Sequence, residues 1–548
     1  MTYTNLRCFF LSLIFLFLAG CGGHNDGSQS QSQVVTIDKN IAGAWTPQNP
    51  NNDAYEFYLS PSNPPFNIGL KTGRILNGGQ LVDRFTWDYL PNGSIALTKV
   101  GLSCGANPLS SCPVTGSATI KAMGTSTQGT ALTFVVASSS GGSAANAVLD
   151  VYTRPLADLS KMSQGEFFLK REENLTTPLQ AKNSGNAISI RMEDLGPPVW
   201  LSAPIPSGSQ ESIAFSAGET TSIIGSDTFD VQGAGATNIP VELWYDNVSL
   251  SASANGGFIL NYEIHRKVQL PNNINASQIS NLGDYEKVDY AAMSFGVINT
   301  FIHGPTLNVG DKYDTLLPVG FNPNWVNVGE GNQLQFSSGT AGTISDTDFL
   351  FNGRYSESLA FNWVQGADGT LSFTFANGIQ ITARFVKQIN GGYQVLYTLP
   401  DPVLGVYFFL HDFLQDTPVA LTAQDVPGHY LFFAGPEIPA DITFHSNGTV
   451  TGTVGGFWFL DANGAIVSYE CKDLSGNEIP AYQDCLASFN DLTKVSFAHI
   501  RHIKIVGKSG NNLSLNYNAA LYGAYFGVVN RDYFTVAQTY EWTRVGPE

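Results

Sequence analysis

Eight Asn-Gly pairs constrain the fold of this chain more than any other feature of its sequence. A type I′ hairpin turn needs positive φ at both central residues, and Asn followed by Gly supplies this at the least cost. Runs on either side of the pairs alternate apolar and polar residues, as in 371–375 and 513–517, which is typical of strands with one buried face. We therefore expect antiparallel hairpins through most of the chain. The pairs begin at Asn77, Asn92, Asn255, Asn352, Asn377, Asn390, Asn447 and Asn463.

The composition agrees with a folded, nearly all-β protein. Charged residues make up 13% of the chain and apolar residues 43%, whereas disorder needs high charge and low hydrophobicity. The 56 glycines and an aromatic content of 12% suit strands and tight turns. Only residues 277–290 and 482–492 show a short helical pattern. A net charge of −18 repels phosphate backbones, so we exclude nucleic acid as a partner.

Two short signatures recur along the chain. The first stands at residues 213–218, 334–339 and 442–448. The second is Phe85-Thr-Trp87 and Phe361-Asn-Trp363, with looser copies at Leu243-Trp244 and Val467-Ser-Tyr469. We interpret them as one β unit of roughly 110–140 residues that is used four times. The expected division is a signal peptide at 1–20, a flexible tether at 21–37, and β units at 38–156, 160–304, 305–415 and 425–548.

The first unit opens with Gly43-Ala-Trp45 and the last with Gly428-His-Tyr430. A Gly-x-Trp opening followed by hairpins and a Phe-x-Trp strand is similar to the small barrels of the calycin (lipocalin-like) group. This resemblance bears on architecture alone. The expected fold class is all-β, with tandem antiparallel β-barrel or β-sandwich units.

The amino terminus has the pattern of an export signal. Arg7 precedes an apolar run at 9–17, which is too short to span a bilayer. Leu18-Ala19-Gly20-Cys21 follows and resembles the lipobox of bacterial lipoproteins. The resemblance implies cleavage before Cys21 and lipidation of that cysteine, and Gly22 after it implies the outer membrane. The alternative is an ordinary secreted protein with a chance cysteine.

Four further cysteines remain for two disulfides in an oxidising compartment. Three pairings are possible, and the short loops favour Cys104–Cys112 and Cys471–Cys485. The sequence contains no CxxC motif and no neighbouring histidine pair, so a zinc site is the weaker interpretation.

Recognised catalytic motifs are missing from the sequence, and we predict no metal and no cofactor. His499 and His502 are three apart in an alternating run, so a strand would place them on opposite faces. Trp87, Trp244 and Trp363 stand at matching points of their units. They are either core anchors, which we favour, or a surface that stacks on a ligand such as carbohydrate.

Taken together, these features predict a lipid-anchored β-repeat protein of the cell envelope. Repetition of one unit without a recurring polar triad favours a non-catalytic module that binds a ligand, either carbohydrate or a small apolar molecule. The alternative is a hydrolase of polymers, with a site assembled between units.

Overall fold

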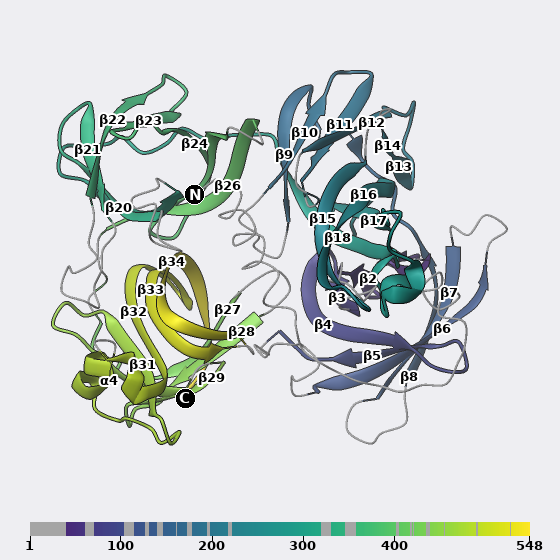
Figure 1. Cartoon of the computed structure of the whole chain (residues 1–548). Coiled ribbons are helices and arrows are strands. Elements are labelled where there is room, and N and C mark those ends of the chain that lie inside the picture. Colours follow the sequence, from purple (N-terminus) through teal and green to yellow (C-terminus); the bar gives the residue numbers. More distant parts are fainter. Residues whose placement is uncertain are drawn as a thin grey trace. The chain divides into compact units, whose positions relative to one another are not determined.

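The computed structural model describes residues 40–548 except for 61–70, 103–113, 126–130, 140–145, 160–161, 172–177, 194, 196–197, 218–221, 319–329, 346–357, 402–404, 417–418, 420, 434–438, 454, 489–490 and 526–527. The chain divides into two compact halves, at residues 40–299 and 300–548. Each half is built from antiparallel strands (Figure 1). No helix among the described residues is long and apolar enough to cross a membrane.

The N-terminal half contains one large sheet of eighteen strands. The first eight strands pair in sequence order, and β8 pairs back with β1 through Thr46 and Thr153, which closes a ring. Strands β9 to β18 form a second run, in which β18 pairs back with β9. The strands of the first ring are β1 (Gly43–Pro47), β2 (Ala54–Leu59), β3 (Lys71–Asn77), β4 (Gln80–Tyr89), β5 (Ile95–Lys99), β6 (Gly116–Thr125), β7 (Ala131–Ser139) and β8 (Asn146–Thr153). Those of the second run are β9 (Gly165–Arg171), β10 (Leu179–Asn183), β11 (Ala187–Met192), β12 (Val199–Pro204), β13 (Ser212–Ala214), β14 (Ser216–Ala217), β15 (Ile223–Val231), β16 (Gly235–Ala252), β17 (Phe258–Val268) and β18 (Asp289–Ile298).

The C-terminal half contains two closed eight-stranded barrels, β19–β26 and β27–β34. We call them barrel 3 and barrel 4. The strands of barrel 3 are β19 (Lys312–Pro318), β20 (Glu330–Phe336), β21 (Ala341–Ser345), β22 (Ser358–Gln365), β23 (Leu371–Phe375), β24 (Gln380–Ile389), β25 (Gly392–Asp401) and β26 (Gly405–Gln415). The strands of barrel 4 are β27 (Gly428–Phe433), β28 (Pro439–Phe444), β29 (Thr449–Gly452), β30 (Gly456–Leu460), β31 (Ile466–Asp473), β32 (Val495–Ser509), β33 (Asn512–Tyr525) and β34 (Val528–Gly546).

This architecture confirms the prediction of an all-β chain made of tandem units. In the C-terminal half the units are barrels and not sandwiches. Helices are short: η4 (Ala276–Gln278), α3 (Leu282–Tyr285), α4 (Tyr482–Ser488) and η5 (Leu492–Lys494). The prediction of a helix at 277–290 is wrong over most of that range. Only the short η4 and α3 form there, and the last residues of the range begin β18. The apolar periodicity there comes from Ile279 and Tyr285, which pack into a small cluster with Phe229 and Val231.

The seven Asn-Gly pairs among the described residues lie in hairpins, but none of their asparagines has the positive φ expected of it in a type I′ turn; Asn352-Gly353 lies outside the described residues. The glycines have positive φ, whereas Asn247 is the only non-glycine residue with positive φ in the described part of the chain. At Asn92-Gly93 the Gly93 N–H donates to the Leu90 carbonyl, and the Asn92 side chain accepts from the Ser94 N–H at 3.0 Å. The asparagine side chain thus stabilises the turn, and the glycine is the residue that adopts the left-handed conformation.

Two units share a packing motif that pairs a glycine with an aromatic ring. Phe85 on β4 lies opposite Gly73 on β3, and Phe361 on β22 lies opposite Gly342 on β21. A Cβ built on Gly73 or Gly342 would lie 2.3 or 2.4 Å from the Cζ of its phenylalanine. No side chain fits between strand and ring, so both positions need glycine.

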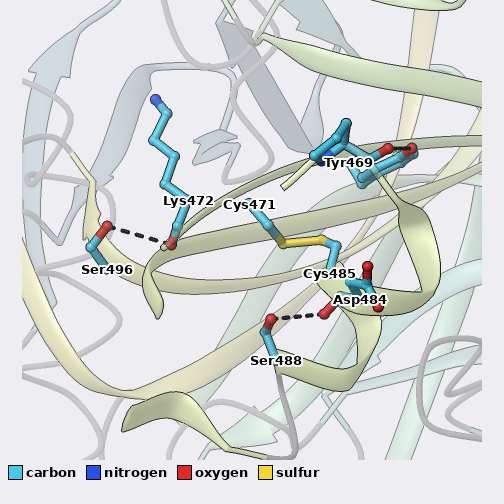
Figure 2. Close-up of a disulfide and its surroundings, with 8 residues drawn as sticks. Tyr469, Cys471, Lys472, Asp484, Cys485, Ser488 and Ser496 are labelled. Atoms are coloured by element: carbon cyan, nitrogen blue, oxygen red, sulfur yellow. Dashed lines mark hydrogen bonds between the residues drawn. A yellow bond between two sulfur atoms is a disulfide. The ribbon is translucent and has the colours of Figure 1, made fainter. Parts of the chain in front are cut away.

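A disulfide joins Cys471 on β31 to Cys485 on α4, the bond expected from their spacing (Figure 2). The Tyr469 hydroxyl donates to the Pro480 carbonyl at 2.6 Å and attaches the same segment to the strand. Cys21, Cys104 and Cys112 lie outside the described residues.

In the N-terminal half, a buried carboxylate ties the first ring to the second run. Glu56 on β2 is fully buried and accepts from Arg74 Nε at 2.6 Å and from Tyr58 Oη. Its other oxygen accepts from the Ser253 hydroxyl and the Ala254 N–H, each at 2.7 Å. The turn after β16 is therefore held against β2, which fixes the β16–β17 ladder in place.

Candidate functional site

Two of the three tryptophans singled out in the sequence lie in equivalent core positions. Trp87 and Trp363 occupy the fourth strands of their units and are 4% and 9% exposed. Each packs edge-to-face against a phenylalanine of the second strand, Phe57 at 5.4 Å and Phe336 at 5.2 Å between ring centroids. Their indole N–H groups donate to backbone carbonyls, of Thr72 at 2.8 Å and of Ser338 at 3.3 Å.

The corresponding residue of the last unit is Trp458, which is not among the residues predicted from the sequence. It lies on the fourth strand, β30, packs edge-to-face against Phe444 at 5.8 Å and donates to the His445 carbonyl at 2.8 Å. The proposed copy at Val467-Ser-Tyr469 lies on the fifth strand, β31. Phe444 belongs to the first signature, so the distance from that signature to the next tryptophan could have revealed the match.

Trp244 differs from the others because it lies half-buried on β16, far from the fourth strand of its run. Its indole stacks on the imidazole of His265, with centroids 5.3 Å apart and planes 22° from parallel. The position it shares with the other tryptophans in sequence is therefore not shared in structure.

Trp244 belongs to a group of four side chains on the β16–β17 ladder, which we call the β16–β17 site. In the register of the two strands Trp244 lies opposite His265, and Asp246 lies opposite Glu263. Residues two apart on a strand share a face, so the four side chains meet. Tyr245, between Trp244 and Asp246, packs instead into the apolar core, which places the site on the outer face of the sheet.

The three polar members present ligand atoms to one another. His265 Nε2 lies 2.9 Å from Glu263 Oε2 and 3.6 Å from Asp246 Oδ2, and one atom from each residue lies within 4.8 Å of the others. The Glu263 side chain is 6% exposed, whereas that of Asp246 is 53% exposed. The site is therefore anchored on its buried side and open to solvent at Asp246.

Backbone and charge both shape this site. A β-bulge begins after Asp246, and Asn247 adopts a φ of 50°. Tyr290 on β18 lies opposite Glu263, and burial together with the Glu263 charge raises the pKa of Tyr290. The phenol thus stays neutral beside the carboxylate.

One imidazole and two carboxylates form a donor set that suits Zn²⁺ and related divalent transition metals. Ligand bonds of about 2.0–2.1 Å in tetrahedral geometry place donor atoms about 3.3 Å apart. The separations of 2.9 and 3.6 Å bracket this value. Three protein ligands would leave a position for water or another ligand. The sequence patterns predict no metal, and neither Glu263 nor His265 is among the predicted site residues, although Trp-x-Asp and Glu-x-His on facing alternating strands are a usable signal.

The other histidines form no comparable group in the part of the chain that the structure describes. His499 bonds to Arg501, whereas His502 bonds to Asp461, so the two histidines point to opposite faces of β32. His411 lies on β26, where burial lowers its pKa to about 4.

Two aspartates meet between barrels 3 and 4, around one lysine. Lys504 Nζ lies 2.7 Å from Asp314 Oδ2 and 2.7 Å from Asp416 Oδ1, and Asp314 is fully buried. Burial raises the pKa of Asp314, although the lysine charge opposes this. Because Lys504 contacts both carboxylates, this group has the character of a structural ion pair.

The sequence matches no protein-family model and no curated protein. Among solved structures, an endo-1,5-α-L-arabinanase from Thermotoga petrophila RKU-1 aligns at 10% identity over 92% of this chain and 98% of its own, with a TM-score of 0.14. A transferrin-binding protein B from Haemophilus parasuis Hp5 aligns at 9% identity over 97% and 99%, with a TM-score of 0.18. A glycoside hydrolase of family 43 from Bacillus licheniformis gives 10% identity, 92% and 99% coverage and a TM-score of 0.15. At such TM-scores these similarities carry no argument about this chain.

Proposed function

We propose that this protein is a lipid-anchored binding protein of the cell envelope whose β16–β17 site holds a divalent transition metal. The observation that carries the proposal is the convergence of Asp246, Glu263 and His265 on one ladder. The ladder is rigid, because its inner face packs into a continuous apolar core. Trp244 holds the imidazole ring from one side, and such support keeps a metal ligand in its binding orientation.

Binding is better supported than catalysis at the positions that the sequence singled out. Trp87 and Trp363 serve their own cores, so they offer no surface for a polymer chain. Both aspartates between barrels 3 and 4 contact Lys504, whereas sugar hydrolysis needs one free acid and one free carboxylate. The hydrolase alternative therefore gains nothing from this pair.

Metal binding is tested on the mature chain after treatment with a chelator. Isothermal titration with Zn²⁺ and Mn²⁺ should show one site, and His265→Ala should weaken binding by at least tenfold. His445→Ala is the matched control, because it removes a part-exposed histidine from the other half. Affinity should fall at acid pH, because protons compete with the metal for its ligands. Equal affinity in wild type and His265→Ala would refute the site, and binding of a neutral sugar instead would favour a carbohydrate surface at Trp244.

The anchor is tested separately through Cys21. Replacement by Ala should leave the precursor unprocessed and move the protein out of the detergent phase in a phase-partition assay. Processed, membrane-retained Cys21→Ala protein would show that the chain is not a lipoprotein, without bearing on the metal site.

A further inference from the structure

Barrel 4 encloses an arginine that has no acidic partner in the part of the chain that the structure describes. Arg501 lies on β32 and is 1% exposed. Its strand neighbours are Ser468 on β31 and Ala519 on β33. Ile503, two residues further along the same face, belongs to the apolar core together with Trp458. Arg501 therefore points into the barrel.

Within the described part of barrel 4, the Arg501 guanidinium forms hydrogen bonds to neutral groups. Its Nη1 donates to the Ser468 hydroxyl at 3.2 Å, and its Nη2 lies 2.7 Å from His499 Nδ1. Burial and the Arg501 charge hold the pKa of His499 well below its usual range, so the imidazole is neutral and accepts through Nδ1. Arg501 Nε is buried and has no hydrogen-bond partner among the described residues.

The nearest acid in the register of these strands is already occupied. Glu470 lies opposite His499, but its carboxylate is 2.7 Å from the ammonium of Lys472.

Two further arginines, the part-buried Arg74 and the buried Arg191, have carboxylate partners. Arg74 pairs with Glu56 at 2.6 Å, and Arg191 pairs with Glu193 at 2.8 Å. Arginine does not lose its proton in proteins, so a buried guanidinium keeps its charge. A buried charge needs an opposite charge, because transfer out of water is otherwise too costly. The described residues supply no such counterion to Arg501.

We propose that barrel 4 binds an organic carboxylate, with Arg501 as the anchoring cation. Arg501 Nε supplies a free donor, and the Ser468 hydroxyl, which accepts from Arg501, retains its own proton for the same oxyanion. Trp458 and Ile503 give an apolar wall, which favours a carboxylate with an apolar body over strongly hydrated phosphate.

The test uses the full mature chain and three probes at equal ionic strength: sodium benzoate, sodium phosphate and sodium chloride. Benzoate should raise the melting temperature in proportion to the logarithm of its concentration, as expected for a ligand of the native state. Phosphate and chloride should give a much smaller rise. A rise with phosphate that equals the rise with benzoate would overturn the preference for a carboxylate.

Arg501→Met keeps the length of the side chain but removes its charge, and benzoate affinity should fall at least tenfold. Lys508→Met is the matched control on the same strand, because Lys508 is exposed and its loss changes net charge equally. If Arg501→Met does not fold, Arg501→Lys retains the charge without the planar fork and should still bind benzoate several-fold more weakly. Unchanged affinity in the folded variant, or no benzoate binding to wild type, would overturn the proposal.

Discussion

Replacement of Trp87 by Ala should strongly destabilise the N-terminal half of the protein. The indole is 4% exposed, packs edge-to-face on Phe57 and donates to the Thr72 carbonyl. Removing it leaves a cavity and deletes that hydrogen bond, which together cost about 3–5 kcal/mol. A change of about 1 kcal/mol shifts the melting temperature of a domain of this size by roughly 2–4 °C. The expected shift is therefore about 6–20 °C.

The assay is thermal and urea unfolding of the full chain, followed by circular dichroism and by the fluorescence of the remaining tryptophans. The transition of residues 40–299 should move, whereas that of residues 300–548 should not, because Trp87 belongs to the first half alone. Trp244→Ala is the control, since that indole is half-buried on the outer face and should cost about 1 kcal/mol or less. If Trp87→Ala unfolds within about 0.5 kcal/mol of wild type, its assignment as a core anchor is wrong.

Two further predictions concern the C-terminal half. The partners of the Cys471–Cys485 disulfide are 14 residues apart, so its reduction should lower the free energy of unfolding by about 3 kcal/mol. Urea titrations with and without reductant measure this difference, and an unchanged midpoint would refute it. His411 has a folded pKa of about 4 against an ordinary value of 6.5, so the unfolded chain binds its proton more readily as the pH falls between these values. The contribution of His411 to the free energy of unfolding should be complete above about pH 6.5 and should decline by up to about 3 kcal/mol towards pH 4. In urea midpoints measured across this range, His411→Gln should flatten the decline. An equally steep decline in the variant would contradict the assignment.

Local sequence was sufficient to predict the class of the fold. Alternation and Asn-Gly pairs identify strands and hairpins, because both depend on residues close together in the chain. The Phe-x-Trp signature located Trp87 and Trp363, whose surroundings are alike in the structure. The bond between Cys471 and Cys485 followed from their proximity in sequence.

Tertiary structure decided the features that depend on pairing between distant strands. The closure of barrels 3 and 4, by β19 with β26 and by β27 with β34, selects a barrel over a sandwich, and no local pattern encodes it. Register likewise placed Trp244 beside His265 and left Trp458, rather than Tyr469, in the position equivalent to Trp363. A slip of one residue would move every side chain of a strand to the other face, so sites built across strands exist only once the pairing is fixed. The sequence specifies which residues alternate, and the folded sheet alone determines which of them meet.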